Sequence, residues 1–220
     1  MMLTFNDIKK SQEINCYISS ADESLKALGY TEHSFGHVEL VAHRAADILR
    51  ALGADDREIE LAMIAGYLHD IGNLVNRTDH SQSGAIMAFR ILDNMGMAAD
   101  EIATVVTAIG NHDEGTGVPV NRVAAALILA DKSDVRRSRV RNGDFASFDI
   151  HDRVNYSVVN TRLSINKEEK TIRLSIEIDT SISSIMDYFQ IFLNRMTLCC
   201  RAGERLGLSF KLTINDQSFI

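Results

Sequence analysis

The chain has 220 residues, a formal net charge of -7 and an isoelectric point of about 5.5. Hydrophobic residues make up 45% of the sequence and charged residues 24%, which is typical of a soluble globular protein with a substantial core. The acidic balance argues against partners that bind through broad positive charge, so neither a nucleic-acid polymer nor a membrane is expected as a partner. No stretch approaches the roughly 20 apolar residues of a membrane-spanning helix.

The N-terminal residues and the cysteines predict a cytoplasmic protein. The first ten residues turn polar before any long apolar run, so no signal peptide is visible. The three cysteines, Cys16, Cys199 and Cys200, are too few and too poorly spaced for a disulfide framework. We therefore expect them to be reduced residues of a cytoplasmic protein.

Helical spacing of apolar residues dominates the first part of the chain. The expected helices cover residues 5–28, 32–52, 55–68, 80–95, 100–112 and 119–137. Gly29, Gly53 and Gly96 mark helix ends, and the spacing of Asp55 and Glu58 is that of a capping box at a helix start. These elements predict an all-helical body.

The pattern changes after about residue 150. Apolar and polar residues alternate at 159–165 and again at 172–178, which is typical of a β-hairpin with one buried face. A long helix is expected at 182–206, and alternation returns at 208–214. No motif that carries chemistry is visible in this part.

The predicted fold is therefore mainly α, with two parts. Residues 1–148 form a helical metal-binding body, and residues 149–220 form a small β-β-α-β appendage. An antiparallel edge of this kind often pairs across a two-fold axis, so a homodimer is also predicted.

Imidazoles and carboxylates stand at the ends of the core-facing stripes of the predicted helices. The group consists of His37, His69, Asp70, His80, His112, Asp113 and Asp131. A single histidine on an apolar face is usually a hydrogen-bonded core residue. Seven such groups together would be costly to bury unless a cation neutralises them, and imidazole and carboxylate are preferred ligands of divalent metals. The sequence therefore predicts a metal centre.

The order of His37, the His69-Asp70 pair and Asp131 resembles the signature of the HD superfamily of metal-dependent phosphohydrolases, whose fold is all-helical. The resemblance covers residues 30–140. It implies that these four residues would hold one divalent metal ion.

His80 and His112 resemble the additional histidines of superfamily members that hold two metals. The resemblance implies that Asp70 would bridge to a second ion, held by this histidine pair. His33 stands where some members have a carboxylate that serves a third metal, so it is also a candidate ligand. The ions would be Mn, Fe, Mg, Co, Ni or Zn, an identity that the ligands leave open.

A partial resemblance extends to the HD-GYP branch, which cleaves cyclic di-GMP. Residues 112–114, His-Asp-Glu, stand where that branch has His-His-Glu, and residues 115–119 resemble a shortened form of its Gly-Tyr-Pro loop. Val118 replaces the tyrosine of that loop, and Asn73 replaces the lysine that commonly follows His-Asp-Ile-Gly. These departures leave the metal ligands in place and the substrate open.

The implied function is a metal-dependent phosphohydrolase that cleaves a phosphate ester through metal-bound hydroxide. Its substrate would be a nucleotide, a cyclic nucleotide (a phosphodiesterase activity) or another small phosphorylated metabolite. Asp70 would hold the nucleophile, and Asp131 and Asp113 could accept or donate a proton. No Gly-x-Ser-x-Gly motif offers a serine nucleophile instead.

The predicted phosphate-binding residues are cations near these ligands. The candidates are Lys132, Arg136 and Arg139, which follow Asp131, and Arg77, which lies between Asp70 and His80. The alternative is that the arginines only complement the negative end of a helix dipole and stay solvated.

Two other functions fit the same ligands. A mixed-valent di-iron oxygenase uses the same ligand order in some relatives, and it would be coloured and dependent on iron and oxygen. A ligand-binding regulator with an inactive site would bind metal without turning over any phosphate ester.

Overall fold

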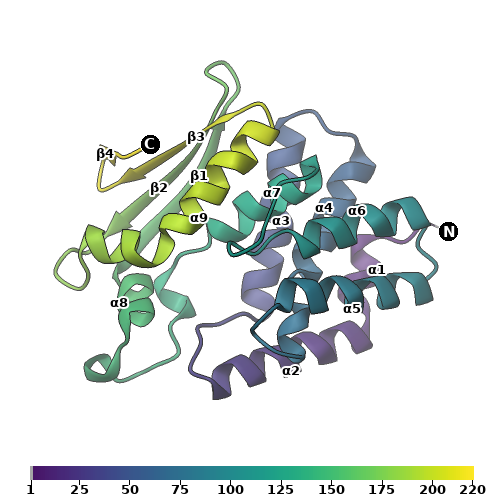
Figure 1. Ribbon diagram of the computed structural model, residues 1–220, viewed down its shortest axis with the longest axis horizontal. Coiled ribbons are helices and arrows are strands. Elements are labelled where there is room, and N and C mark those ends of the chain that lie inside the picture. The colour runs from purple at the N-terminus through teal and green to yellow at the C-terminus, as the bar shows by residue number, and fades with distance from the viewer. Residues whose placement is uncertain (1) are drawn as a thin grey trace.

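The computed structural model of the protein describes residues 2–220 and shows a helical body beside a small sheet (Figure 1). The body is built from α1 (Phe5–Lys10), α2 (Gln12–Ala27), α3 (Phe35–Ala51), α4 (Asp56–Leu68), α5 (His80–Asn94), α6 (Ala99–Gly110) and α7 (Arg122–Lys132). The C-terminal elements are α8 (Ile150–Ser157), β1 (Val158–Asn166), β2 (Thr171–Ile178), α9 (Ile185–Arg205), β3 (Ser209–Ile214) and β4 (Gln217–Ser218). The mainly α fold that the sequence predicts is confirmed.

Local sequence explains where several helices begin and end. The Asp55 side chain accepts a hydrogen bond from the backbone amide of Glu58 at 2.8 Å, which caps the start of α4. Gly29, Gly53 and Gly96 have φ values of 82°, 69° and 78°, a left-handed conformation that suits glycine and stops a helix. These glycine stops are confirmed as the ends of α2, α3 and α5.

Two stretches differ from the sequence expectation. α7 ends at Lys132 rather than near residue 137, and the chain continues as an irregular segment with a short 3-10 turn at Arg137–Arg139. This earlier end lets the side chain of Asp134 turn inward to contact His37. α8 is not among the helices expected from the sequence, and it is capped by the Asp149 side chain, which accepts a hydrogen bond from the Asp152 amide at 2.8 Å.

The four strands form one sheet in the order β1-β2-β3-β4. β1 and β2 are an antiparallel hairpin with Leu163 opposite Leu174, whereas β3 lies parallel to β2 with Leu212 opposite Leu174. A parallel pair needs a crossover connection, and α9 provides it. α9 lies across the sheet and also packs against α7, so it stands between the sheet and the helical body (Figure 1).

Two glycines allow unusually close contacts around the His69-Asp70 segment. A Cβ atom on Gly66 would lie 2.6 Å from the Cα atom of Ala42, so this glycine lets α4 approach the backbone of α3. A Cβ atom on Gly72 would lie 2.0 Å from the carbonyl oxygen of His80 and 2.4 Å from the amide nitrogen of Gly84. The end of α4 is therefore held directly against α3 on one side and α5 on the other.

Within residues 2–220, no helix combines the length and the apolar character that crossing a membrane would require.

Candidate metal centre

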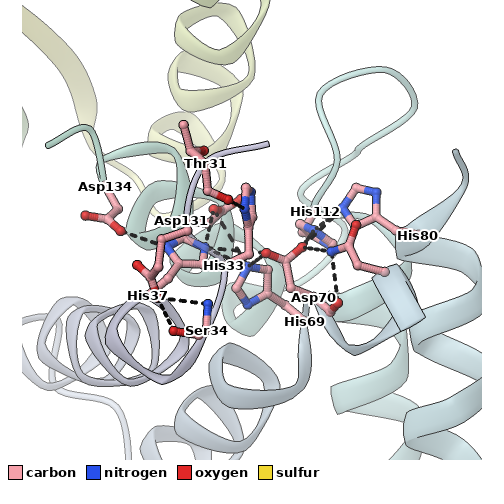
Figure 2. A network of polar contacts seen from close by, with 12 residues as sticks. Thr31, His33, Ser34, His37, His69, Asp70, His80, His112, Asp131 and Asp134 are labelled. Atoms are coloured by element: carbon pink, nitrogen blue, oxygen red, sulfur yellow. Dashed lines mark hydrogen bonds and ion pairs between the residues drawn. The ribbon is translucent and has the colours of Figure 1, made fainter. Parts of the chain in front are cut away.

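Four buried histidines direct their Nε2 atoms into one region (Figure 2). His37 belongs to α3, His69 follows α4, His80 begins α5 and His112 follows α6, and their exposed fractions are 0%, 0%, 4% and 1%. The Nδ1 atom of each ring is hydrogen-bonded on the far side. The partners are Asp134 Oδ2 at 2.7 Å and the backbone carbonyl oxygens of Gly66 at 2.8 Å, Arg77 at 3.1 Å and Ile109 at 2.6 Å.

These hydrogen bonds fix the tautomers of the rings. A carbonyl oxygen can only accept, so the Nδ1 atoms of His69, His80 and His112 carry protons, and in a neutral ring the Nε2 atom then presents a lone pair. His80 Nε2 and His112 Nε2 are 3.2 Å apart, and burial lowers the pKa of both rings, that of His112 well below its usual value. Two unprotonated nitrogens at this distance cannot hydrogen-bond to each other, whereas a metal ion between them would satisfy both.

A second pair of ring nitrogens faces the same region from the other side. His37 Nε2 and His69 Nε2 are 3.2 Å apart. Burial disfavours a charged His69, but the adjacent Asp70 carboxylate outweighs it and raises the pKa of this ring. In the metal-free protein a proton on His69 Nε2 would therefore allow it to donate a hydrogen bond to His37 Nε2. A metal ion bound by the two nitrogens would replace that proton.

Asp70 lies between the two histidine pairs (Figure 2). Its Oδ2 atom is 3.6 Å from His37 Nε2 and 3.3 Å from His69 Nε2. Its Oδ1 atom is 3.4 Å from His80 Nε2 and 3.9 Å from His112 Nε2. One carboxylate thus offers one oxygen to each histidine pair and could contribute a ligand to metal held by either.

Asp131 completes the donor set from the end of α7. Its Oδ1 atom lies 3.4 Å from His37 Nε2 and 3.7 Å from His69 Nε2. Ligand atoms within 4.8 Å of one another form three overlapping groups, made of His37, His69 and Asp70, of His69, His112 and Asp131, and of Asp70, His80 and His112. This set of imidazole nitrogens and carboxylate oxygens fits divalent metal ions.

The two carboxyl groups are held in their ionised form. Burial opposes the ionisation of Asp70, but the neighbouring His69 holds the pKa of this carboxyl well below its usual value. Burial also opposes the ionisation of Asp131, and the ammonium group of Lys132 keeps its pKa well below the usual value. Both groups are therefore ready to bind a cation at neutral pH.

Asn73 holds Asp70 in place. Its Nδ2 atom donates to the backbone oxygen and to Oδ1 of Asp70, both at 2.9 Å. Arg77 donates to Asn73 Oδ1 at 3.2 Å, and its guanidinium carbon lies 5.8 Å from the centre of the Tyr30 ring. Asn73, which stands where the HD-GYP branch commonly has a lysine, therefore positions the Asp70 carboxylate in this chain.

A cavity of about 440 Å³ opens over the donor set. The structure places most of the predicted site residues on its walls, namely His33, Asp70, Arg77, His80, His112, Asp131, Lys132 and Arg139. His33 hydrogen-bonds through Nδ1 to the Thr31 carbonyl oxygen at 2.7 Å, and its ring centre is 5.6 Å from that of His37.

Two predicted site residues lie elsewhere. Arg136 is outside the residues that line the cavity, because its Nε atom donates to Asp134 at 2.8 Å and its NH2 group contacts Glu32. Asp113 belongs to none of the three groups among the described residues, and its Oδ2 atom accepts from the Gly115 amide at 3.2 Å. Both side chains make local contacts, and the Asp113 carboxylate is still near enough to His80 to act against the lowering of the pKa of that ring by burial.

Sequence reasoning missed several residues of the site, and three of them matter most for its geometry. Asp134 orients the His37 ring, and Glu114 and Arg195 line the cavity. Glu114 had a signal, since it ends the His-Asp-Glu run that begins at His112. Arg195 had none, because its contact depends on α9 packing against α7.

The fold and the site together define a helical protein whose histidines and aspartates could hold divalent metal. Residues 34–136 match the family model described as HD domain, and they contain all six residues of the donor set. This match identifies an HD domain in residues 34–136, and HD domains define a superfamily of metal-dependent phosphohydrolases.

Two further comparisons report similar proteins. An uncharacterized protein of Methanocaldococcus jannaschii is 24% identical over 213 residues, which cover 86% of this chain and 80% of the relative. A crystal structure of a predicted HD superfamily hydrolase from an uncultured Thermotogales bacterium is 25% identical, with a TM-score of 0.45. That match covers 59% of this chain and 72% of the other.

Asp134→Asn is expected to weaken metal binding by about 10- to 100-fold, the usual effect of removing the partner that orients a ligand. The amide is neutral and no longer holds the His37 ring with a charged acceptor. Calorimetric titration of the metal-stripped protein with Mn²⁺ or Zn²⁺ measures the effect. Asp47→Asn, on the same helix as His37 but with a side chain 72% exposed, is the control and should bind metal like the wild type. Equal affinities for both variants would contradict the role of Asp134.

Proposed function

We propose that the protein is a metal-dependent hydrolase of small phosphate esters, acting on a nucleotide, a cyclic nucleotide or another small phosphorylated metabolite. The observation that carries this proposal is the position of the Nε2 atoms of His80 and His112, which lie 3.2 Å apart beside the Asp70 carboxylate. When bound to such a donor set, two divalent ions lower the pKa of a shared water molecule and neutralise the oxygens of a phosphate ester.

The residues around the donor set have separate tasks. The two carboxylate oxygens of Asp131 face different partners. Oδ1 faces His37 and His69, and Oδ2 lies 2.7 Å from Lys132 Nζ. Lys132 thereby orients the carboxylate and adds a positive charge at the edge of the cavity. As an ionised group, Asp131 can also accept a proton from a reacting water molecule.

The cavity suits a small anionic substrate. Arg77, Lys132 and Arg139 contribute positive charge to its walls, and the exposed ring of Tyr30 lies at the same opening. Arg139 also has a structural task, since it donates to the backbone oxygens of Glu32 and Asp134, both at 2.9 Å. A volume of about 440 Å³ is within the usual range of small-molecule sites.

The test is elemental analysis of the purified protein followed by an activity screen. The protein is stripped with a chelator, reloaded separately with Mn, Fe, Mg, Co, Ni or Zn, and assayed with nitrophenyl phosphate, bis(nitrophenyl) phosphate and a panel of nucleotides. We expect bound metal in the purified protein, no turnover after stripping, and recovery with at least one of these ions.

Two outcomes would contradict the proposal. A coloured iron protein that consumes oxygen and releases no phosphate would be an oxygenase. Tight metal binding without turnover of any ester would indicate a ligand-binding regulator.

A further inference from the structure

Helix α9 of the C-terminal part contributes to the metal cavity. Phe192 and Arg195 line it together with His80, His112 and Asp131. Phe192 is 2% exposed, and the side chain of Arg195 is 22% exposed. A part of the chain without any catalytic motif thus places a cation beside the donor set.

The guanidinium group of Arg195 is held in one orientation. Its Nε atom donates to Glu114 Oε1 at 3.0 Å, and its central carbon lies 4.4 Å from the centre of the Phe192 ring. Within residues 2–220, its two terminal amino groups have no hydrogen-bond partner. An arginine fixed through Nε and stacked on a ring presents these two groups as a fork, which is the geometry that binds phosphate.

Glu114 links this arginine to the metal ligands. Its Oε1 atom contacts Arg195, and its Oε2 atom lies 2.7 Å from Lys132 Nζ. Lys132 Nζ is in turn 2.7 Å from Oδ2 of Asp131. One carboxylate therefore holds two cations side by side at the edge of the donor set.

We propose that Arg195 binds the phosphoryl group of the substrate, with Lys132 beside it and Glu114 positioning both. This inference rests on the proposed function and narrows its substrate class to phosphate monoesters. A diester has two non-bridging oxygens, which two divalent ions would already neutralise. A monoester has a third non-bridging oxygen and a second negative charge, and the two terminal amino groups of Arg195 can bind that additional oxygen.

The experiment measures binding of inorganic phosphate to the metal-loaded, full-length protein by calorimetry. Arg195→Gln is expected to raise the dissociation constant of phosphate about tenfold or more, the effect of losing a hydrogen bond to a charged group. Arg195→Lys keeps the charge but loses the fork, and should fall between Arg195→Gln and the wild type.

Arg201→Gln is the matched control, because Arg201 is an exposed arginine of the same helix and lies outside the cavity lining. Its phosphate affinity should equal that of the wild type, and metal content should be unchanged in all variants. A second readout is the ratio of kcat/KM for nitrophenyl phosphate to that for bis(nitrophenyl) phosphate, which Arg195→Gln should lower.

The inference is overturned if Arg195→Gln and Arg201→Gln bind phosphate equally, if the wild type binds none, or if Arg195→Gln loses its metal. The proposed function is judged separately, by turnover of esters in the wild type. If the wild type turns over esters but binds phosphate independently of Arg195, the proposed function stands and the inference about Arg195 is wrong. If Arg195 binds phosphate but no ester is turned over, Arg195 is part of an anion-binding site and the proposed function is wrong.

Discussion

Asp70→Asn is expected to remove metal from both histidine pairs and to lower ester hydrolysis by about a thousandfold or more, the upper range for loss of one electrostatic group in an active site. The reason is that each oxygen of Asp70 faces a different pair, so one substitution affects both halves of the centre. Asparagine has nearly the same shape, and the fold should persist.

Metal-induced stabilisation provides a measurement that does not depend on turnover. An ion at 100 times its dissociation constant stabilises the folded state by about 2.7 kcal/mol. The wild type should therefore unfold at a higher temperature with metal than with chelator, and Asp70→Asn should lose this difference. Asp93→Asn, an exposed position of α5, should keep it. An Asp70→Asn protein with full metal content and full activity would contradict the assignment of the site.

Gly72→Ala is expected to destabilise the protein by about 3 kcal/mol, the upper part of the usual range for overpacking. The added Cβ atom would lie 2.0 Å from the carbonyl oxygen of His80 and 2.4 Å from the amide of Gly84. Both are backbone atoms of α5, so relief requires the whole helix to move. His80 would move with the helix, and the affinity of the His80 and His112 pair for metal should fall.

The measurement is denaturant unfolding together with metal stoichiometry. Gly110→Ala is the control in the neighbouring helix α6, because its Cβ atom would lie 3.5 Å from Ala85 Cβ, an ordinary contact. Alanine is favoured over glycine within a helix by about 0.5–1 kcal/mol, so this variant should be neutral or slightly stabilised. If Gly72→Ala unfolded at the same denaturant concentration as the wild type, the close contact of α5 with this segment would be contradicted.

Much of the helical body could be predicted because helical period and glycine stops are local features. The period shows which way a residue near a helix end points, and it correctly brought the histidines and Asp131 toward one another. Asp113, which follows the end of α6 and lies in a turn, is in none of the three donor groups of the described residues, and its role in proton transfer stays a prediction.

The remaining contacts depend on tertiary structure. Arg136 and Arg139 are three residues apart in the irregular segment after α7, yet only Arg139 lines the cavity. No periodic pattern could separate them. Arg195 was out of reach for a different reason, because α9 meets α7 only as a result of the crossover that joins β2 to β3.

The facing imidazoles of His80 and His112 have a consequence for how long the protein survives in a cell. Without an ion, their Nε2 atoms lie 3.2 Å apart in a buried site with no proton between them, which disfavours the folded chain relative to the metal-loaded one. A newly made chain that meets scarce divalent ions would spend more of its time unfolded, where proteases cut it. The steady-state amount of this protein should therefore rise and fall with the supply of its ion, even at a constant rate of synthesis.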